Sequence, residues 1–292
     1  MSKKSEKFIE WILKGCALIT IMTTIGIIWI LLFESISFFK EVPLKDFLTD
    51  TQWTPLFADK HFGIMPLLSG TLLTTFIAVS IALPVGLIIA VYLSQYAPNG
   101  FRKTAKPLLE ILAAVPTVVY GFFALVVVTP FLQKLIPSMA GFNALSAGIV
   151  MGIMIIPFIS SLSEDALQAV PKSLRDAAYG LGSTRLQTSF KVMVPAASSG
   201  IIVSVILAFS RAIGETMIVA IAAGQQPRLT ANPLVPIETI TTYIVQVSLG
   251  DVPHGTLEYK TIFAAGIALF VFTFILNNIS YWIRMKFREQ YD

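Results

Sequence analysis

Residues 164–195 read EDALQAVPKSLRDAAYGLGSTRLQTSFKVMVP and separate two long apolar segments. Leu167, Val170 and Leu174 recur near helical spacing, so we expect a short amphipathic helix over residues 167–181. Gly182 follows this stretch, and glycine readily adopts the left-handed conformation that ends a helix. The pattern predicts a helix presented by a loop, a shape that can dock into a groove on another protein.

The rest of the chain is strongly apolar. Of its 292 residues, 55% are hydrophobic and 13% are charged, whereas an average soluble domain is about 25% charged. The mean hydropathy is +0.77. This composition predicts an integral membrane protein. The formal net charge of +4 does not call for nucleic acid, because most basic residues lie in short loops beside apolar segments.

Six segments are long and apolar enough to cross a membrane as helices. They cover residues 11–33, 66–93, 107–132, 143–163, 197–223 and 261–283. A closed barrel is excluded because these runs do not alternate between apolar and polar residues. The predicted fold is therefore all-α, with six transmembrane helices. Prolines at positions 84, 116, 130 and 157 are expected to kink them, and Gly148 and Gly152 predict close helix packing.

The distribution of basic residues predicts the orientation. If the N-terminus is inside, 14 of the 21 Lys and Arg residues fall on the inner side, which predicts that both termini are cytoplasmic. The first apolar segment is longer than the core of a signal peptide, so we interpret it as an uncleaved anchor. We expect three parts: residues 1–65, a core of 66–283 that contains the loop 164–195, and a cytoplasmic tail of 284–292.

Enzymatic and metal chemistry find little support in the sequence. Cys16 is the only cysteine, and His61 and His254 are far apart in polar connections, where we expect them to be solvated. We find no nucleophile–base set, and the phosphate-binding pattern G-x-x-x-x-G-K-[ST] is absent. We therefore expect neither a metal nor a cofactor on this chain, and any ATP hydrolysis on a separate polypeptide.

Two charges interrupt the fifth apolar segment, in the stretch SRAIGETMIVAIAAG at residues 210–224. Arg211 and Glu215 are four positions apart and are expected to share one helix face. A charge at that depth costs from ~2.5 to more than ~10 kcal/mol, so such residues tend to line a transport path. A guanidinium offers forked donors that fit tetrahedral oxyanions. A static internal ion pair is the alternative.

Glu215 needs its own explanation beside an anion. Some tetrahedral oxyanions, phosphate among them, keep at least one proton near neutral pH, and a carboxylate can accept a hydrogen bond from such a group. Sulfate has no proton to donate, so the carboxylate would discriminate against it by repulsion. Glu110, Tyr120 and Thr216 also fall at membrane depth, and the sequence leaves their roles open. Glu110 is expected to reach the inner interface or to pair with a basic residue such as Arg102 or Lys106.

The loop 164–195 resembles the coupling loop of ABC import permeases. That motif reads Glu-Ala-Ala, three residues, Gly, nine residues and Ile-x-Leu-Pro. Here Asp176-Ala177-Ala178 is followed at the same spacing by Gly182 and by a Val-Met-Val stretch that ends at Pro195. Asp replaces Glu, and Val replaces Ile and Leu, which preserves charge and apolar character. The resemblance implies that these residues contact the ATPase.

The stretch at 210–224, together with LEILAAVPTVVYGFFAL at 109–125, resembles the phosphate-specific ABC permeases of the PstC type over residues 10–285. The resemblance implies a type I importer fold in the bacterial inner membrane and phosphate passage past Arg211 and Glu215. It also implies a second, PstA-type permease, two copies of a PstB-type ATPase that uses ATP, and a PstS-type extracytoplasmic phosphate-binding protein. Alternatives are a permease for molybdate or sulfate, or a secondary anion transporter that needs no ATPase.

Overall fold

The structure is a computed structural model that describes residues 3–286. Residues 287–292 of the predicted tail, with Arg288, lie outside this range. Helices account for nearly all regular structure, and two isolated β-bridges are the only strand-like pairings within residues 3–286. The prediction of an all-α fold is confirmed.

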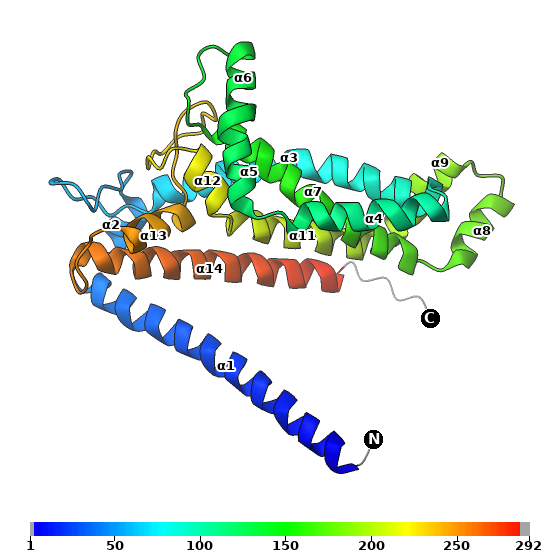
Figure 1. Ribbon diagram of the computed structural model, residues 1–292, viewed down its shortest axis with the longest axis horizontal. Helices are drawn as coiled ribbons and strands as arrows, with labels where there is room; N and C mark the ends of the chain where they lie inside the picture. Colours follow the sequence, from blue (N-terminus) through cyan, green and yellow to red (C-terminus); the bar gives the residue numbers. More distant parts are fainter. Residues whose placement is uncertain (1–2, 287–292) are drawn as a thin grey trace.

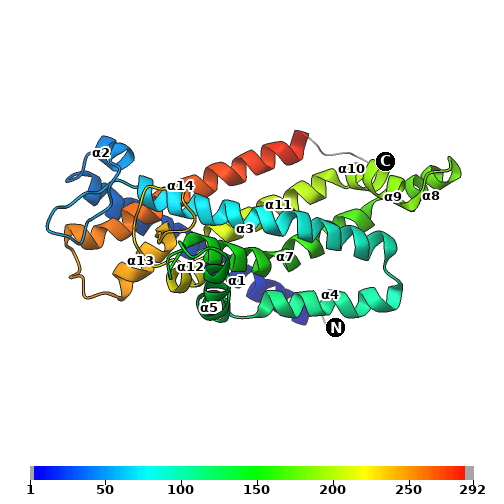
Figure 2. The ribbon, with the colours of Figure 1, turned by 90° about the horizontal axis from the view of Figure 1, so that it is seen from above.

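Three helices form the centre of the molecule: α3 (Met65–Val91), α7 (Ala144–Ala169) and α11 (Ser198–Ile213). They run alongside one another in both views (Figures 1 and 2). The contact between α3 and α7 depends on small residues. A Cβ on Gly148 would lie 2.7 Å from a side-chain carbon of Ile77, and one on Gly152 would lie 2.9 Å from the carbonyl oxygen of Ala78. The predicted close packing is confirmed.

Two long helices flank this centre. α14 (Leu257–Lys286) packs against α11, and α1 (Lys3–Phe39) contacts α14 near its own C-terminal end and then diverges from it (Figure 1). Most described side chains of α1 are exposed, including Trp11 and Trp29. An exposed apolar helix of this kind is expected to face lipid or a neighbouring subunit.

The third predicted span, 107–132, is wrong as one helix. α4 (Asn99–Ala114) ends before Val115 and Pro116, which are extended with ψ of 131° and 134°. Proline lacks an N–H and disfavours a helical residue before it, which explains the break. After it come α5 (Thr117–Phe123), the π-helix η2 (Ala124–Val128) and α6 (Thr129–Leu135), which point away from the direction of α4 (Figure 1).

The fifth predicted span, 197–223, is also broken. The preceding segment Arg185–Ala196 meets α11 at an angle of 72°, and α11 itself ends at Ile213, before a separate α12 (Met217–Ala222). Within the described residues, five helices are long and apolar enough to span a membrane, and the bent pair gives a sixth. The number of spans therefore agrees with the sequence prediction, although two of the six have different boundaries.

The two long connections, 34–65 and 224–260, pack together at the end of the molecule opposite to α8 (Figure 1). They contain α2 (Leu44–Thr49) and α13 (Ile240–Leu249), and share an aromatic core with Phe38, Trp53 and Tyr243. His61 is partly exposed, as expected, but it is not isolated, because its Nδ1 lies 2.8 Å from Asp50 Oδ2. That carboxylate raises the pKa of His61 above its ordinary value.

Candidate functional site

Arg211 lies in the last turn of α11 and is exposed, on the same stripe as exposed Leu207 and Gly214. Ser204 and Ala208, on the neighbouring stripe, are buried against the bundle. Within the described residues Arg211 forms neither an ion pair nor a hydrogen bond. A guanidinium on the apolar surface of a membrane helix has to meet water, a substrate or another subunit.

Glu215 does not share a helix face with Arg211, and this prediction is wrong. α11 ends at Ile213 with Gly214 as its C-cap, and Glu215 lies in the break before α12. No ion pair joins the two residues in the described part of the chain. Glu215 is 8% exposed, and its Oε1 accepts hydrogen bonds from the backbone N–H groups of Met217 (3.1 Å) and Ile218 (3.3 Å).

The break is stabilised from both sides. The carboxylate of Glu215 occupies two of the free N–H groups at the start of α12, and the hydroxyl of Thr241 donates to the Glu215 carbonyl oxygen at 2.8 Å. Free backbone groups at membrane depth require partners of this kind. Glu215 therefore holds a broken helix in shape, and Arg211 stands exposed on the turn before the break.

The other polar residues at membrane depth, Tyr120, Thr216 and Glu110, lie in different environments. The hydroxyl of Tyr120, a buried residue, donates to the carbonyl oxygen of Leu112 at 2.8 Å and bridges the break between α4 and α5. Thr216 precedes α12, and its hydroxyl lies 3.4 Å from the Gly214 carbonyl oxygen. Glu110 is exposed on α4.

Residues 170–197 connect α7 to α11 and are called the elbow from here on; they contain α8 (Lys172–Gly180). The predicted single helix over 167–181 is wrong, because α7 ends at Ala169 and Val170 is extended before Pro171. Leu167 and Val170 belong to a buried cluster with residues such as Ala90 and Met193. The predicted stop at Gly182 is confirmed. Its φ is +82°, and Gly182 N–H donates to Tyr179 while Ser183 N–H donates to Ala178, a Schellman ending.

The motif residues occupy different places in this elbow. Asp176, Ala177 and Gly182 are exposed, while Ala178 is 7% exposed and faces inward. α9 (Arg185–Thr188) begins at a capping box formed by Thr184 and Gln187. It continues through η3 (Ser189–Met193) into α10 (Val194–Ala196), where Pro195 lies just before the 72° bend.

An ion-pair network beside the elbow was missed by the sequence reasoning. Glu164, whose side chain is 1% exposed, forms an ion pair with Arg102 Nε at 2.6 Å and accepts a hydrogen bond from Lys106 Nζ at 3.0 Å. Arg102 and Lys106 therefore pair with Glu164 rather than with Glu110. Burial alone would lower the pKa of Lys106, but its hydrogen bonds to Asp165 and Glu164 raise it. Opposite charges in two distant loops cannot be paired from one sequence.

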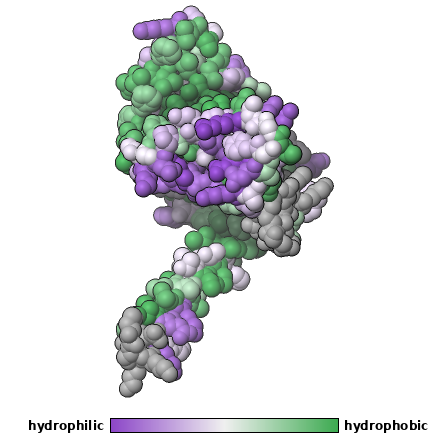
Figure 3. Space-filling view, turned by 90° about the vertical axis from the view of Figure 1, so that its right-hand side faces the viewer, coloured by the Kyte–Doolittle hydropathy of each residue, from purple (hydrophilic) through white to green (hydrophobic). Residues whose placement is uncertain are grey.

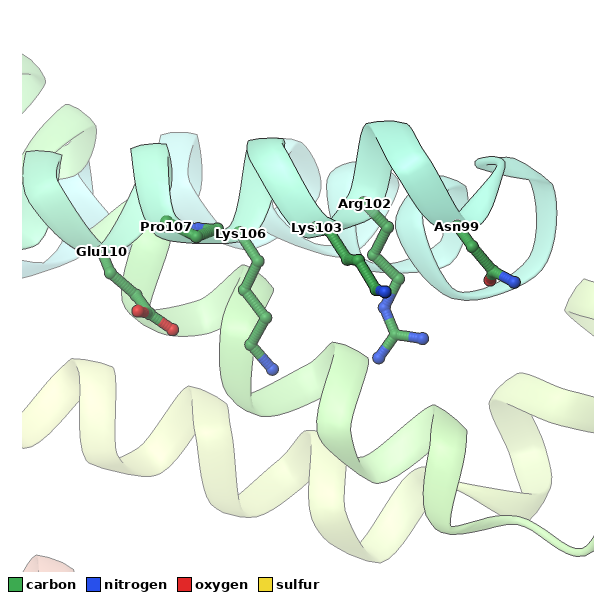
Figure 4. Close-up of a pocket in the computed structure, with 6 residues that line it drawn as sticks. All are labelled: Asn99, Arg102, Lys103, Lys106, Pro107 and Glu110. Atoms are coloured by element: carbon green, nitrogen blue, oxygen red, sulfur yellow. The ribbon is translucent and has the colours of Figure 1, made fainter.

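Figure 4 shows the α4 side of this network. Arg102, Lys103, Lys106 and Glu110 all point from α4 toward the neighbouring helix and line an open cavity of about 430 Å³. Since Glu164 and Asp165 lie at the end of α7, close before the elbow, the network ties α4 to the segment that leads into α8.

Seen from the end that carries α8, hydrophilic residues gather across the bundle, whereas the parts above and below are mainly hydrophobic (Figure 3). The N-terminal end of α1 and the C-terminal end of α14 point toward this same end of the molecule (Figures 1 and 2). The elbow therefore lies at a polar end of the molecule.

Comparisons with known proteins identify the family. Residues 82–289 match the model of the binding-protein-dependent transport system inner membrane component. The chain is 36% identical to the probable ABC transporter permease protein YqgH of Bacillus subtilis, over 90% of this chain and 86% of that protein. It is 35% identical to the phosphate transport system permease protein PstC of Mesorhizobium japonicum, over 82% of this chain and 78% of that protein.

Solved structures agree on the fold. A bacterial ABC transporter that imports the polysaccharide alginate matches with a TM-score of 0.62 at 18% identity, over 96% of this chain and 99% of that one. The MetNI methionine transporter matches with a TM-score of 0.58, over 78% and 95%. The chain therefore belongs to the family of binding-protein-dependent transport system inner membrane components, together with the PstC-type phosphate permeases.

Proposed function

We propose that this chain is a membrane-spanning permease subunit of an ATP-driven importer that carries inorganic phosphate into the cytoplasm. The assignment of phosphate as the substrate rests on the 35% identity to a phosphate transport permease protein over 82% of the chain. Similar proteins named as phosphate permeases come from Xylella fastidiosa and Haemophilus influenzae, at 34% and 32% identity.

The other subunits of the transporter are separate chains. A second, PstA-type permease covers the exposed face of α11, two copies of a PstB-type ATPase hydrolyse ATP, and a PstS-type protein delivers phosphate from outside. This chain itself binds no cofactor. Both termini and the elbow lie on the cytoplasmic side of the bacterial inner membrane, and residues 66–283 form the permease core.

Arg211 is the residue we assign to the phosphate path. Its guanidinium is exposed, and its five N–H donors form no hydrogen bond within residues 3–286 of this chain, so they remain for a tetrahedral oxyanion. The path then runs along the exposed stripe of α11, between this chain and the second permease.

Glu215 is assigned a supporting part. One carboxylate oxygen accepts the hydrogen bonds from the start of α12, and the other can accept a hydrogen bond from a protonated oxygen of phosphate. Glu215→Gln keeps an acceptor for the two backbone N–H groups but removes the negative charge. The Glu215→Gln substitution is expected to lower the ratio of the phosphate uptake rate to the sulfate uptake rate. An unchanged ratio would remove Glu215 from substrate selection.

The elbow is assigned the contact with the ATPase. Leu181 is 89% exposed and Leu186 is 62% exposed, although both lie at the polar end of the molecule. Apolar side chains in such a position favour burial in a groove of another protein. Asp176, Ala177, Ala178 and Gly182 shape this contact, and Pro195 precedes the bend that passes its movement to α11.

The test is uptake by proteoliposomes that contain the chain with its partner permease and ATPase and enclose ATP. Radiolabelled phosphate should accumulate in the presence of the binding protein, and excess sulfate or molybdate should not compete. Gly182→Val should uncouple ATP hydrolysis from uptake, because its φ of +82° is strained for valine. Competition by sulfate or molybdate at the level of phosphate would favour the other oxyanion, and uptake without ATP would favour a secondary transporter.

A further inference from the structure

A cavity of about 280 Å³ lies between the two outer connections. Its walls come from residues 53–57, from residues 225–227, and from Glu238 with the face of α13. All three segments lie at the end opposite to the elbow (Figure 1). The cavity is therefore separate from the path along α11 and from the contact with the ATPase.

Glu238 is the one ionisable carboxyl group among the residues that line this cavity. It is 1% exposed, and its Oε1 has no hydrogen-bond partner. Burial raises the pKa of Glu238 to about 8. A buried carboxyl oxygen without a partner is costly in a folded protein. It indicates either strain or a site for an absent donor.

Trp53 belongs to the wall formed by residues 53–57. It is 1% exposed, and its Nε1 is also buried without a partner. An antiparallel bridge to Phe62 and edge contacts with Phe47 and Tyr243 hold the indole in place. The hydroxyl of Tyr243 is already engaged at 2.6 Å with Thr261. The cavity thus offers a free acceptor beside an aromatic wall.

The wall formed by residues 225–227 begins in a strained conformation. Gln225 has φ of +49°, which is unusual for a residue other than glycine, and it follows Gly224 at φ of +95°. Gly224 is bridged to Ile237, the residue before Glu238. Such strain persists only where the surrounding structure fixes it, and it is common at ligand sites.

The lining excludes most ligand classes. An anion would meet Glu238 and no basic lining residue. A purely apolar group would leave Glu238 Oε1 unpaired. An ammonium or guanidinium on an aliphatic stem satisfies both demands, because the stem packs against Leu56, Phe57 and Pro227 while the head pairs with the carboxylate and lies near aromatic rings.

We propose that the cavity receives the head of a lysine or arginine side chain from the extracytoplasmic binding protein when that protein docks on the permease. The inference rests on the proposed function for the identity of the docking protein. A cation that enters the cavity favours the ionised form of Glu238 and so lowers its raised pKa, which lets the two groups pair. The cavity also lies at the end opposite to the ATPase contact, where a docking protein from outside would meet it. A buried side chain that fills a pocket is the usual form of a dominant contact in an interface.

The first arm of the test needs no transport activity. The full-length chain with Trp11, Trp29 and Trp282 replaced by Phe reports on Trp53 alone by fluorescence. n-Butylammonium and n-butylguanidinium should change this fluorescence saturably, and n-butanol should bind about tenfold more weakly or worse, as expected for the loss of a charge-assisted contact. Glu238→Gln should abolish the preference for the cations. Equal responses to butanol and to the cations would overturn the proposal.

The second arm measures docking of the purified binding protein on the assembled transporter. Glu238→Gln should raise the Kd by about tenfold or more, while Glu258→Gln, which removes another outer carboxylate paired with Lys60, should have little effect. n-Butylammonium should compete with docking. A cavity that binds the cations without any effect on docking would refute the side-chain occupant. If phosphate is not the substrate, the uptake assay will show it, and the fluorescence and docking measurements will still test the cavity.

Discussion

At the scale of single residues, the membrane-depth charges have separate tasks. Arg211 is exposed at the end of α11, and Glu215 is buried, where it holds the start of α12. The positive charge is therefore not neutralised within the described part of this chain. An exposed arginine on an apolar helix is expensive as a structural device, and this cost favours a functional explanation.

Glu238 gives a prediction about stability and pH. Its pKa is near 8 in the folded chain and near 4.5 when unfolded, so the folded state keeps a proton that the unfolded state releases. This stabilisation is complete below about pH 4.5 and is lost as the pH rises to about 8, at roughly 1.4 kcal/mol per pH unit. In detergent, the melting temperature should fall more steeply with rising pH for the parent than for Glu238→Gln.

The comparison isolates Glu238 because His61 titrates in the same range in both proteins, and Tyr243, whose pKa is raised by burial, stays protonated. Parallel melting curves for the parent and the variant across pH 5–8 would mean that Glu238 is ionised in the folded state.

The sequence predicted the accessible position of Arg211, but it did not predict that Glu215 lies in a break between two helices. A charge in an apolar run is visible without coordinates, and it signals exposure to water or substrate. The role of Glu215 depends on the end of α11 at Ile213 and on the contact from Thr241, which is 26 positions away. Neither can be read from spacing, because the stretch Gly214-Glu215-Thr216 contains no proline and the apolar run resumes directly at Met217.

At the scale of elements, the α3–α7 contact carries much of the packing. Gly152→Val would place side-chain atoms where a Cβ alone is already 2.9 Å from the Ala78 carbonyl oxygen. We expect it to destabilise the protein by roughly 1–3 kcal/mol, seen as a lower melting temperature in detergent. Gly26→Val is the matched control, since nothing lies within 4 Å of a Cβ on Gly26. Equal melting temperatures for the two variants would contradict the packing.

Element boundaries mark the limit of the sequence prediction. Hydropathy located all six apolar segments, and Gly182 was read correctly as a helix end because its signal is local. The breaks at Pro116 and Pro171 were missed although proline signals both, since prolines such as Pro84 and Pro157 lie inside continuous helices. Only tertiary packing decides which proline bends a helix and which one ends it.

At the scale of the whole molecule, the N-terminal end of α1 and the C-terminal end of α14 point toward the end that carries the elbow, and the two long connections, 34–65 and 224–260, lie at the other end (Figure 1). This arrangement predicts the topology. A fluorescent protein fused at either terminus should fluoresce in the cytoplasm, and alkaline phosphatase inserted after Leu229, an exposed residue of the outer connection, should be active. Active phosphatase at the C-terminus would reverse the proposed orientation.

The central claim is that phosphate passes Arg211 while ATP is hydrolysed on another chain, and the most direct measurement is ATP-dependent phosphate uptake by reconstituted Arg211 variants. Arg211→Ala should lower the rate by about tenfold or more, because a charge-assisted contact with the moving anion is lost. Arg211→Lys should retain more activity, and Lys134→Ala, which removes an exposed charge on α6, should match the parent. Uptake by Arg211→Ala at the parental rate would contradict the account.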